Sequence, residues 1–370
     1  MAADPAAESR VLGRLVIRGV LSRESVQELF DRARLAAESG QPQLLSELLV
    51  EAGLLSAEAF ALYLRTDGED VPNLPGHIYL SKLGEGGTAS VFAVRRLKDG
   101  AELAVKVLKP ELAAEASMVK AFLGEAKLLQ RLDHPNVIKG FKAGRIDGSY
   151  VSIMETVAGR TLQEAIAAGG AFDEDGALLV ILAAARALDY LREHGVVHRD
   201  IKPGNIMVTD DSTVKVIDLG FAMTADGEGG DGATTIGTAA FLSPEQAQGR
   251  VDLDVRSDIY ALGASLYQLV LGELPFSGDD EELVQKAVLE GLSATATKGG
   301  RISAHMHYFI EKMMAKDREH RYQDPKELIA DIERQIQGKK DLDFDGGGEE
   351  ESQEMLRKRL ARLRRRRGRR

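Results

Sequence analysis

The sequence of 370 residues contains no cysteine. Without thiols the chain can form neither a disulfide framework nor a thiolate metal site, which fits a reducing compartment. Long hydrophobic runs are missing too, because the longest apolar stretch, residues 177–185, is far shorter than the roughly 20 apolar residues of a membrane-spanning helix. The opening MAADPAAESR lacks the charged and then apolar start of a signal peptide. We therefore expect a cytoplasmic protein without a transmembrane segment.

The net charge of −10 conceals an uneven distribution of charge along the chain. The last 14 residues carry ten Lys or Arg side chains and no acidic one, so the other 356 residues, with 38 basic and 58 acidic side chains, have a net charge of −20. An acidic body with a basic end predicts a specialised terminal segment. Hydrophobic residues make up 44% of the chain, which is enough for a well-formed core.

The pattern along the chain predicts four segments. Residues 10–66 read as a small all-α module and residues 67–75 as a polar, proline-bearing linker. In residues 76–337 strands come first and helices follow, which indicates an α+β fold with two lobes and a cleft between them. Residues 338–370 form an acidic, glycine-bearing linker and the basic tail, which we expect to be disordered.

The helical module contains a weak internal repeat of 34 residues, in which residues 15–30 align with residues 49–64. In each copy an apolar helix end meets a glycine and then a serine N-cap, Ser22 or Ser56, which predicts a helix-turn-helix joint. The module has no cluster of chemically reactive residues. We therefore favour a packing unit or a dimer surface over catalysis.

Charged side chains interrupt an apolar stretch at VVHRDIKPGNIMV, residues 196–208. The flanks favour strands or buried positions, whereas Pro203 and Gly204 force an irregular backbone between them. A buried charge is costly unless it is paired or used, so a solvated loop explains one of these charges but not all of them together. The candidate functional residues of this segment are His198, Arg199, Asp200, Lys202 and Asn205.

A glycine-rich turn precedes this charged segment in the chain. In LGEGGTASVFAV, residues 83–94, the glycines lead into an alternating strand pattern rather than a helix, which predicts a hairpin whose N–H groups can lie over phosphates. Lys106 follows on the next predicted strand, and Glu125 lies on an amphipathic helix where it can pair with Lys106. The plain alternative for Lys106 is a solvated strand lysine.

Together these motifs resemble the protein kinase signature. The set comprises GxGxxxxV, AVK, the helix glutamate, HRDxKxxN and the DLG of residues 218–220, in the usual order over roughly residues 76–337. HRDIKPGN and GTAAFLSPEQAQG, residues 237–249, look most like the bacterial eukaryotic-like (Hanks-type) serine/threonine kinases. The resemblance implies a bilobal α+β protein kinase fold that transfers the γ-phosphate of ATP to Ser or Thr hydroxyls of protein substrates, with Mg²⁺ as the metal.

The resemblance also implies a role for each charged group. Asp200 would orient the substrate hydroxyl and accept its proton, and Lys202 would neutralise the transferring phosphoryl group. Lys106, fixed by Glu125, would hold the α and β phosphates. Positioning and charge neutralisation are what phosphoryl transfer requires. The implied Mg²⁺ ligands are Asn205 and Asp218.

The nucleotide pocket follows from the same resemblance. The loop over the phosphates would consist of Gly84, Glu85, Gly86 and Gly87. The apolar residues around the adenine ring would be Leu83, Val91, Ala104 and Met207, with Met154 as gatekeeper. The backbone of Glu155 and Val157 would hydrogen-bond the edge of the ring. Elsewhere, Glu245 and Arg321 would form a buried ion pair, and Asp258 would clamp the catalytic loop.

The chain departs from the family pattern at four positions that carry no catalytic charge: Ala89 for the third glycine, Leu219 for Phe, Ser243 for Ala and Arg318 for Pro. In the activation loop, residues 218–245, the resemblance implies that Arg199 pairs with a phosphate. Thr234 and Thr235 are the expected autophosphorylation sites, and the alternative is that they belong to a flexible polar loop.

Two other functions compete with a protein kinase. A pseudokinase acting as a nucleotide-sensing scaffold would usually lack Lys, Asn or Asp of the catalytic set, and this chain has all three. A small-molecule phosphotransferase of kinase-like fold is less favoured because the SPE segment and a long activation loop are present.

The basic tail needs an anionic partner or a shell of counterions. In residues 349–370 the leucines Leu356, Leu360 and Leu363 form a narrow apolar stripe, which predicts a helix that forms only on contact. Nucleic acid, an acidic membrane surface and the acidic body of the chain itself are candidate partners. A solvated tail without a role is the remaining alternative. The pattern favours tethering to nucleic acid or another polyanion.

Overall fold

The computed structural model describes residues 5–66, 72–169, 171–220, 222–224, 239–276, 278–279, 282, 292 and 301–342. The chain folds into two compact units. The first contains the N-terminal part up to Gln130 together with Gly140–Thr156, and the second contains Arg131–Lys139 and the chain from Val157 onwards. The predicted phosphorylation sites Thr234 and Thr235 and the basic tail lie outside the described residues.

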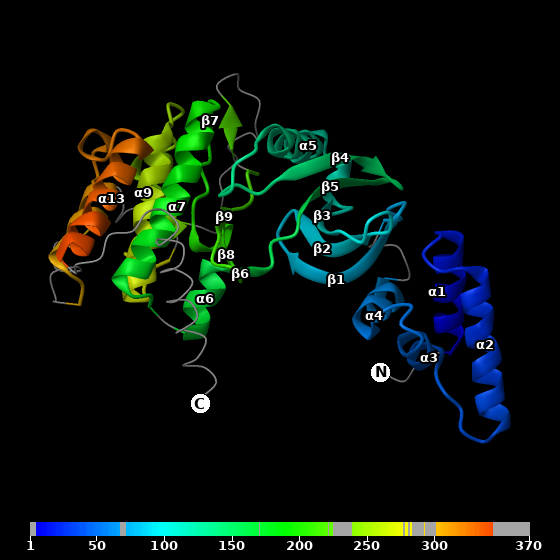
Figure 1. The fold of residues 1–370 in the computed structure, drawn as a ribbon. Helices are drawn as coiled ribbons and strands as arrows, with labels where there is room; N and C mark the ends of the chain where they lie inside the picture. The colour runs from blue at the N-terminus through cyan, green and yellow to red at the C-terminus, as the bar shows by residue number, and fades with distance from the viewer. Residues whose placement is uncertain are drawn as a thin grey trace. The chain divides into compact units, whose positions relative to one another are not determined.

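The first unit begins with four helices, shown in blue in Figure 1: α1 (Pro5–Ile17), α2 (Arg23–Glu38), α3 (Leu45–Glu51) and α4 (Ala57–Thr66). The predicted repeat appears as two helix pairs with the same turn. Gly19 and Gly53 both adopt left-handed backbone conformations, with φ of 70° and 66°. Ser22 then accepts a hydrogen bond from Ser25 N–H (3.0 Å), and Ser56 accepts one from Ala59 N–H (3.1 Å). Both serine N-caps are confirmed.

A five-stranded antiparallel sheet follows the helices, with strand order β1-β2-β3-β5-β4. Its strands are β1 (His77–Glu85), β2 (Ala89–Arg96), β3 (Glu102–Leu108), β4 (Gly140–Ile146) and β5 (Ser149–Glu155). A short 3₁₀ turn, η1 (Leu112–Ala114), and the helix α5 (Ala116–Arg131) connect β3 to β4. Phe122 of α5 is buried in a cluster with Ala89 and Leu108 of the sheet.

The helices and the sheet of the first unit share one hydrophobic core. Phe60 of α4 and Phe92, Val94 and Val105 of the sheet are all buried in it. Tyr63 of α4 contacts Tyr79 of β1 edge to face, with ring centroids 6.3 Å apart. The helix α4 therefore lies against β1, as Figure 1 shows.

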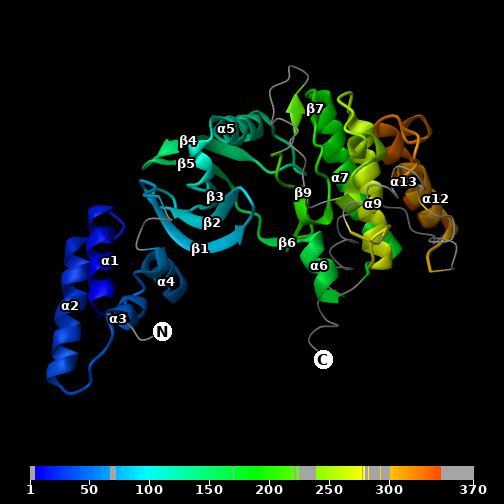
Figure 2. The ribbon, with the colours of Figure 1, turned by 180° about the vertical axis from the view of Figure 1, so that it is seen from behind.

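The second unit is mainly helical. Its helices are α6 (Leu162–Gly169), α7 (Glu174–Glu193), α8 (Pro244–Ala247), α9 (Val255–Leu271), α12 (Ala304–Met313) and α13 (Pro325–Leu342). Every residue of α9 except Arg256 is buried, as expected for a helix that is surrounded by protein. Figures 1 and 2 show α7 beside α9, and α7 also packs against α13.

Short strands and 3₁₀ turns in the second unit hold the charged segment that the sequence singled out. The strands are β6 (Gly159–Thr161), β7 (Val196–Val197), β8 (Ile206–Thr209), β9 (Val214–Val216) and β10 (Met223–Thr224), and the turns are η2 (Pro203–Asn205), η3 (Ala239–Phe241) and η4 (Arg318–His320). The strand β8 pairs with β6 and β9, and β7 pairs with β10. The charged segment, residues 198–205, thus lies between β7 and β8, and each of these strands pairs with a different neighbour.

The observed element order confirms the predicted α+β class, with strands in the first unit and helices dominating the second. Two helix ends differ from the expected segment limits: α1 begins at Pro5, and α13 continues to Leu342. None of the helices among the described residues combines the length and apolarity that crossing a bilayer requires.

Candidate functional site

Lys106 and Glu125 form an ion pair in the first unit. Lys106 lies on β3, and its Nζ is 2.9 Å from both carboxylate oxygens of Glu125 on α5. Their side chains are only 14% and 7% exposed. A lysine held by two equal contacts in a partly buried position is fixed in place, which excludes the alternative of a freely solvated strand lysine.

The face of the sheet that carries Lys106 also carries most of the apolar residues expected around a nucleotide. Val91 lies opposite Lys106 across the β2–β3 pair, and Ala104 lies opposite Met154 across the β3–β5 pair. Because residues two apart on a strand share a face, these four side chains lie on one side of the sheet. Ala104 and Met154 are buried.

The other residues expected around the nucleotide lie elsewhere on the sheet or in the second unit. Leu83, near the end of β1, is 53% exposed, which is unusual for a leucine in a strand. Glu155 ends β5 and lies opposite Leu103, and Val157 follows two residues later at the start of the second unit. Met207 is on β8 in the second unit.

The backbone does not require a glycine at Gly84, near the end of β1, or at Gly86 and Gly87 in the turn that follows. A Cβ on Gly84 or Gly87 would meet no atom within 4 Å, and a Cβ on Gly86 would lie 3.7 Å from the nearest atom, Ala89 O. None of the three has a backbone conformation that only glycine favours. Three small residues beside open space fit a ligand that must approach the backbone closely, as phosphates do.

Asp200 is the centre of the charged segment in the second unit. Its side chain is 8% exposed. Lys202 Nζ lies 2.7 and 3.0 Å from its two carboxylate oxygens. Asn205 donates from its amide nitrogen to the carboxylate and to the backbone carbonyl of Asp200, both at 2.8 Å. The structure therefore brings together the three side chains that the sequence predicted to act together.

Asp218 is joined to this centre through the backbone. Ile217 N–H donates to the carbonyl of Asn205 at 2.9 Å, so the residue before Asp218 is anchored on the candidate metal ligand. Asp218 has a left-handed backbone with φ of 65°, and its carboxylate accepts a hydrogen bond from Gly220 N–H (3.2 Å). Leu219, which replaces the usual Phe, is 2% exposed and packs in the interior.

The side chains available for a cation here are oxygen donors. Asn205 uses its amide nitrogen on Asp200, which leaves its amide oxygen to face a metal, and Asp218 contributes a carboxylate. Carboxylate and amide oxygens are the ligands that Mg²⁺ prefers in proteins. The donor set thus fits the expected metal.

Asp258, at the start of α9, holds the backbone of the charged segment. Its two carboxylate oxygens accept hydrogen bonds from His198 N–H (2.8 Å) and Arg199 N–H (2.7 Å). Burial raises the pKa of Asp258 to about 7, although these two bonds act in the opposite direction. Arg199 has a φ of 68°, which is an uncommon conformation for a residue with a side chain, and the clamp holds it there.

His198, in contrast, is a packing residue. It is fully buried, and burial lowers its pKa, so the ring is neutral. Its Nδ1 accepts a hydrogen bond from Asp200 N–H at 3.3 Å. His198 therefore supports the backbone of Asp200.

Glu245 and Arg321 form the expected buried ion pair. Two hydrogen bonds of 2.6 and 2.8 Å join the guanidinium to the carboxylate, and Ser257 Oγ donates a third bond to Glu245 (2.8 Å). Burial acts to raise the pKa of Glu245, but the Arg321 hydrogen bonds and charge outweigh it and bring that pKa to about 2. Glu245 is therefore ionised at neutral pH.

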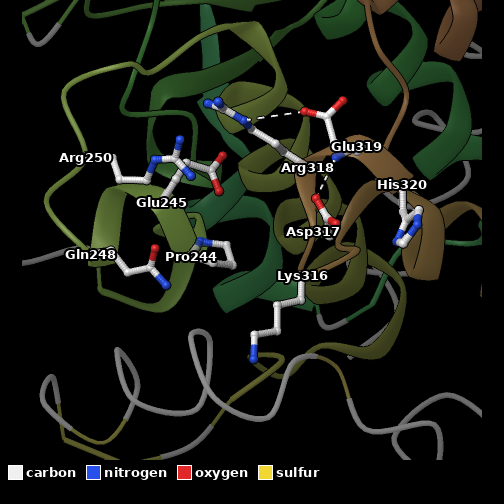
Figure 3. A pocket seen from close by; sticks show the side chains of 9 residues that line it. All are labelled: Pro244, Glu245, Gln248, Arg250, Lys316, Asp317, Arg318, Glu319 and His320. Atoms are coloured by element: carbon white, nitrogen blue, oxygen red, sulfur yellow. Dashed lines mark hydrogen bonds and ion pairs between the residues drawn. The ribbon is translucent and has the colours of Figure 1, made fainter.

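A pocket of about 640 Å³ lies beside this ion pair (Figure 3). The described residues that line it are Pro244, Glu245, Gln248, Arg250, Lys316, Asp317, Arg318, Glu319 and His320. Arg250 and Arg318 both bind Asp252 at the pocket edge, with shortest contacts of 2.6 and 2.8 Å. None of the predicted catalytic residues is among this lining, and its arginine charges are already paired.

Gln246 is a residue that sequence reasoning missed. Its amide nitrogen donates to the carbonyl of Arg199 at 2.9 Å, which ties α8 to the charged segment. Ser243 and Gln246 also form a reciprocal capping box at the start of α8. The Ser-x-x-Gln spacing was visible in the sequence and could have predicted this cap. This cap explains the serine at position 243, where the family pattern has Ala.

Comparison with known proteins agrees with this geometry. Residues 78–331 match the model of the protein kinase domain, which spans both the Lys106–Glu125 pair and the Asp200 centre. The chain belongs to the protein kinase domain family. The resemblance inferred from the motifs is confirmed, and so is the protein kinase fold.

Three curated proteins that the chain resembles come from bacteria. A probable serine/threonine-protein kinase of Clostridium perfringens, CPE1738, is 36% identical over 257 residues, which cover 69% of this chain and 37% of the relative. The serine/threonine-protein kinases PknB of Mycolicibacterium smegmatis and Mycobacterium tuberculosis are 35% and 36% identical over 265 and 261 residues. These alignments cover 69% and 68% of this chain and 42% and 41% of the relatives. The chain therefore spans about two fifths of the length of these relatives.

Proposed function

We propose that this chain is an ATP- and Mg²⁺-dependent protein serine/threonine kinase. The observation that carries the proposal is the centre formed by Asp200, Lys202 and Asn205 in a member of the protein kinase family. The names of its bacterial relatives support Ser and Thr as the acceptor residues. Its substrates would be proteins that present a Ser or Thr hydroxyl.

Asp200 is the proposed base for the substrate hydroxyl. It is nearly buried, and Asn205 holds its carboxylate from one side by a 2.8 Å hydrogen bond. The proton of the hydroxyl would move to this carboxylate as the oxygen attacks the γ-phosphorus, while the bond from the γ-phosphorus to the bridging oxygen breaks and ADP leaves. Lys202 contacts the same carboxylate. Its ammonium group can neutralise the negative charge on the phosphoryl group during transfer.

Asn205 and Asp218 are the proposed Mg²⁺ ligands. A bound Mg²⁺ supplies charge neutralisation on the phosphate oxygens. The chain contributes the amide oxygen of Asn205, whose orientation is fixed by the bonds that its amide nitrogen makes to Asp200. It also contributes the carboxylate of Asp218, placed by the bond between Ile217 and Asn205.

For the nucleotide, we propose that Lys106 binds the α and β phosphates and that Glu125 positions Lys106. The glycine-rich loop, Gly84–Gly87, would lie over the phosphates, where small residues permit close approach. Val91, Ala104 and Met154 would line the adenine pocket from the face of the sheet that carries Lys106. Leu83, Met207 and the backbone of Glu155 and Val157 complete the proposed pocket.

We also propose that the kinase is activated by autophosphorylation at Thr234 or Thr235. Arg199 supports this proposal, because its buried Nε has no hydrogen-bond partner among the described residues. It lines a pocket of about 580 Å³ together with Arg192 and Arg256, whose charges are already paired with Asp189 and with Asp254 and Glu319. A phosphate of charge about −2 would therefore pair with Arg199 itself. Mass spectrometry after incubation with Mg-ATP tests this: we expect phosphate within residues 233–238, and its absence there would exclude the mechanism.

Several broader features stay predictions from the sequence. They are the segment limits 10–66, 67–75, 76–337 and 338–370, a cytoplasmic location, dimerisation through the helical module, and binding of a polyanion by the basic tail. The complete set of charged catalytic residues argues against a pseudokinase scaffold. The SPE segment and the long activation loop argue against a small-molecule phosphotransferase.

The direct test of the proposed function is transfer of labelled phosphate from ATP to proteins. Wild-type chain should label itself or added protein on Ser and Thr in the presence of Mg²⁺, and chelation of the metal should abolish labelling. Asp200→Asn should label neither. Equal labelling by wild type and Asp200→Asn would reject the proposed function.

A further inference from the structure

Glu85, the last residue of β1, is an unexpected residue to find at a turn that is proposed to lie over phosphates. It is the second residue of the GEGG turn, and its carboxylate is 52% exposed. A carboxylate beside the triphosphate of ATP would repel it. The structure shows that this charge does not stand alone, because two lysines contact it.

The first lysine, Lys82, comes from the same strand. Its Nζ lies 2.6 Å from Glu85 Oε2, near an irregularity in the β1–β2 pairing between Lys82 and Gly84. The second, Lys109, comes just after β3, and its Nζ lies 3.3 Å from Glu85 Oε1. The hydrogen bonds from Lys82 and then from Lys109 lower the pKa of Glu85. The carboxylate thus bridges a lysine of β1 and a lysine that follows β3.

The backbone joins the loop to Lys109 a second time. Lys109 N–H donates to the carbonyl of Thr88 at 3.0 Å, and within the loop Gly86 N–H donates to the carbonyl of Ala89 at 2.9 Å. Lys109 is also the less exposed of the two lysines, with a side chain 22% exposed compared with 40% for Lys82. Lys109 therefore contacts both the tip of the loop and the carboxylate of its second residue.

We propose that Glu85 and Lys109, with Lys82 as a second contact, form a latch that holds the glycine-rich loop in position for ATP. This inference rests on the proposed function. Gly86 and Gly87, beside open space, give the turn conformational freedom that must be lost before it can cover phosphates. The latch restricts the loop before ATP binds, so less conformational entropy is lost on binding. Glu85 and Lys109 are therefore positioning residues that act through the loop rather than catalytic residues.

A direct electrostatic role for the same residues predicts a different result. If the three charges simply acted on the phosphates, removing the carboxylate would strengthen ATP binding and removing a lysine would weaken it. If they form a latch, losing either partner frees the loop, so both changes weaken binding. Once one partner is gone, losing the other changes nothing more. A double-mutant cycle separates the two cases.

The experiment measures the equilibrium Kd of a fluorescent ATP analogue with Mg²⁺ for the full chain and its variants Glu85→Gln, Lys109→Met and the double variant. The latch predicts that each single change raises Kd by about two- to five-fold, as for exposed ion pairs. The double variant should resemble either single variant, and Lys109→Arg should bind like wild type. The effect should shrink at high salt, because exposed charges are screened.

Glu102→Gln is the matched control, because Glu102 pairs with Arg95 on the same sheet at 2.9 Å with similar exposure and lies outside the loop. Its Kd should equal that of wild type. Tighter binding by Glu85→Gln, additive single effects, or no change in either single variant would overturn the latch. Phosphoryl transfer by wild type and Asp200→Asn, measured alongside, shows separately whether the proposed function holds.

Discussion

Glu245 and Arg321 show how buried charges stabilise the second unit. Both residues are at most 3% exposed, and Arg321 also donates to the backbone carbonyls of Ala315, Arg256 and Lys316. Removing one member of such a pair leaves the other as an uncompensated buried charge. Arg321→Gln should therefore lower the free energy of unfolding by about 3–5 kcal/mol, measured by urea denaturation.

The Arg186–Glu333 pair is the control for this prediction, since it has a similar contact of 2.8 Å but side chains 38% and 47% exposed. Arg186→Gln should change stability by no more than about 1 kcal/mol. If both variants lost the same free energy, burial would not be the reason for the effect.

The pair also predicts how stability depends on pH. The folded pKa of Glu245 is about 2, below the value of about 4.3 expected in the unfolded chain. Its contribution is therefore fully present above about pH 4.3 and is lost as the pH falls towards 2. The stability difference between wild type and Glu245→Gln should narrow over this acid range.

Residue-level interactions could be predicted from the sequence only where a motif fixed both partners. The pairs Lys106–Glu125 and Glu245–Arg321 were expected because the family motifs name both members of each pair. The contact of Gln246 with the Arg199 carbonyl and the bridge from Glu85 to Lys109 were not expected. They depend on how a turn or a bulge directs a side chain, and no spacing in the sequence encodes that direction.

At the level of elements, the contact between α4 and β1 is the main feature that the sequence did not reveal. The repeat predicted the helix ends correctly, because a glycine followed by a capping serine is a local signal. Helical periodicity identifies an apolar face but not the element that covers it. Leu74, within the predicted linker, is buried in the core that the helices share with the sheet.

Tyr63 tests how much this contact matters. Its hydroxyl accepts a buried hydrogen bond of 3.2 Å from Tyr79 N–H in β1. Tyr63→Phe would leave that N–H without a partner at a cost of about 1–3 kcal/mol. We expect lower thermal stability and faster amide hydrogen exchange in β1.

Tyr308→Phe is the comparison for Tyr63→Phe, because Tyr308 is 47% exposed and its hydroxyl accepts a hydrogen bond from Lys312 of the same helix (3.2 Å) instead of one from the sheet. It should leave exchange in β1 unchanged. Normal exchange in β1 of Tyr63→Phe would mean that the helices do not stabilise the strand that leads into the glycine-rich loop.

For the whole molecule, the central claim is that the chain catalyses phosphoryl transfer with Asp200 as its base. The candidate residues are divided between the two units: Lys106 and Glu125 belong to the first, and Asp200, Asn205 and Asp218 belong to the second. In the proposed function Asp200 acts on the substrate hydroxyl rather than on the nucleotide, so its substitution should affect transfer and not ATP binding. An amide in place of the Asp200 carboxylate keeps the shape of the side chain and removes the base.

The most direct test measures ATP binding and phosphoryl transfer on the same preparation of Asp200→Asn. Loss of a positioned base lowers the rate of transfer by about 10²–10⁴-fold. We expect this loss of transfer together with a Kd for Mg-ATP within about three-fold of wild type and a normal melting temperature, because only an interaction of the transition state is removed. Transfer at close to the wild-type rate by a folded Asp200→Asn chain would contradict it.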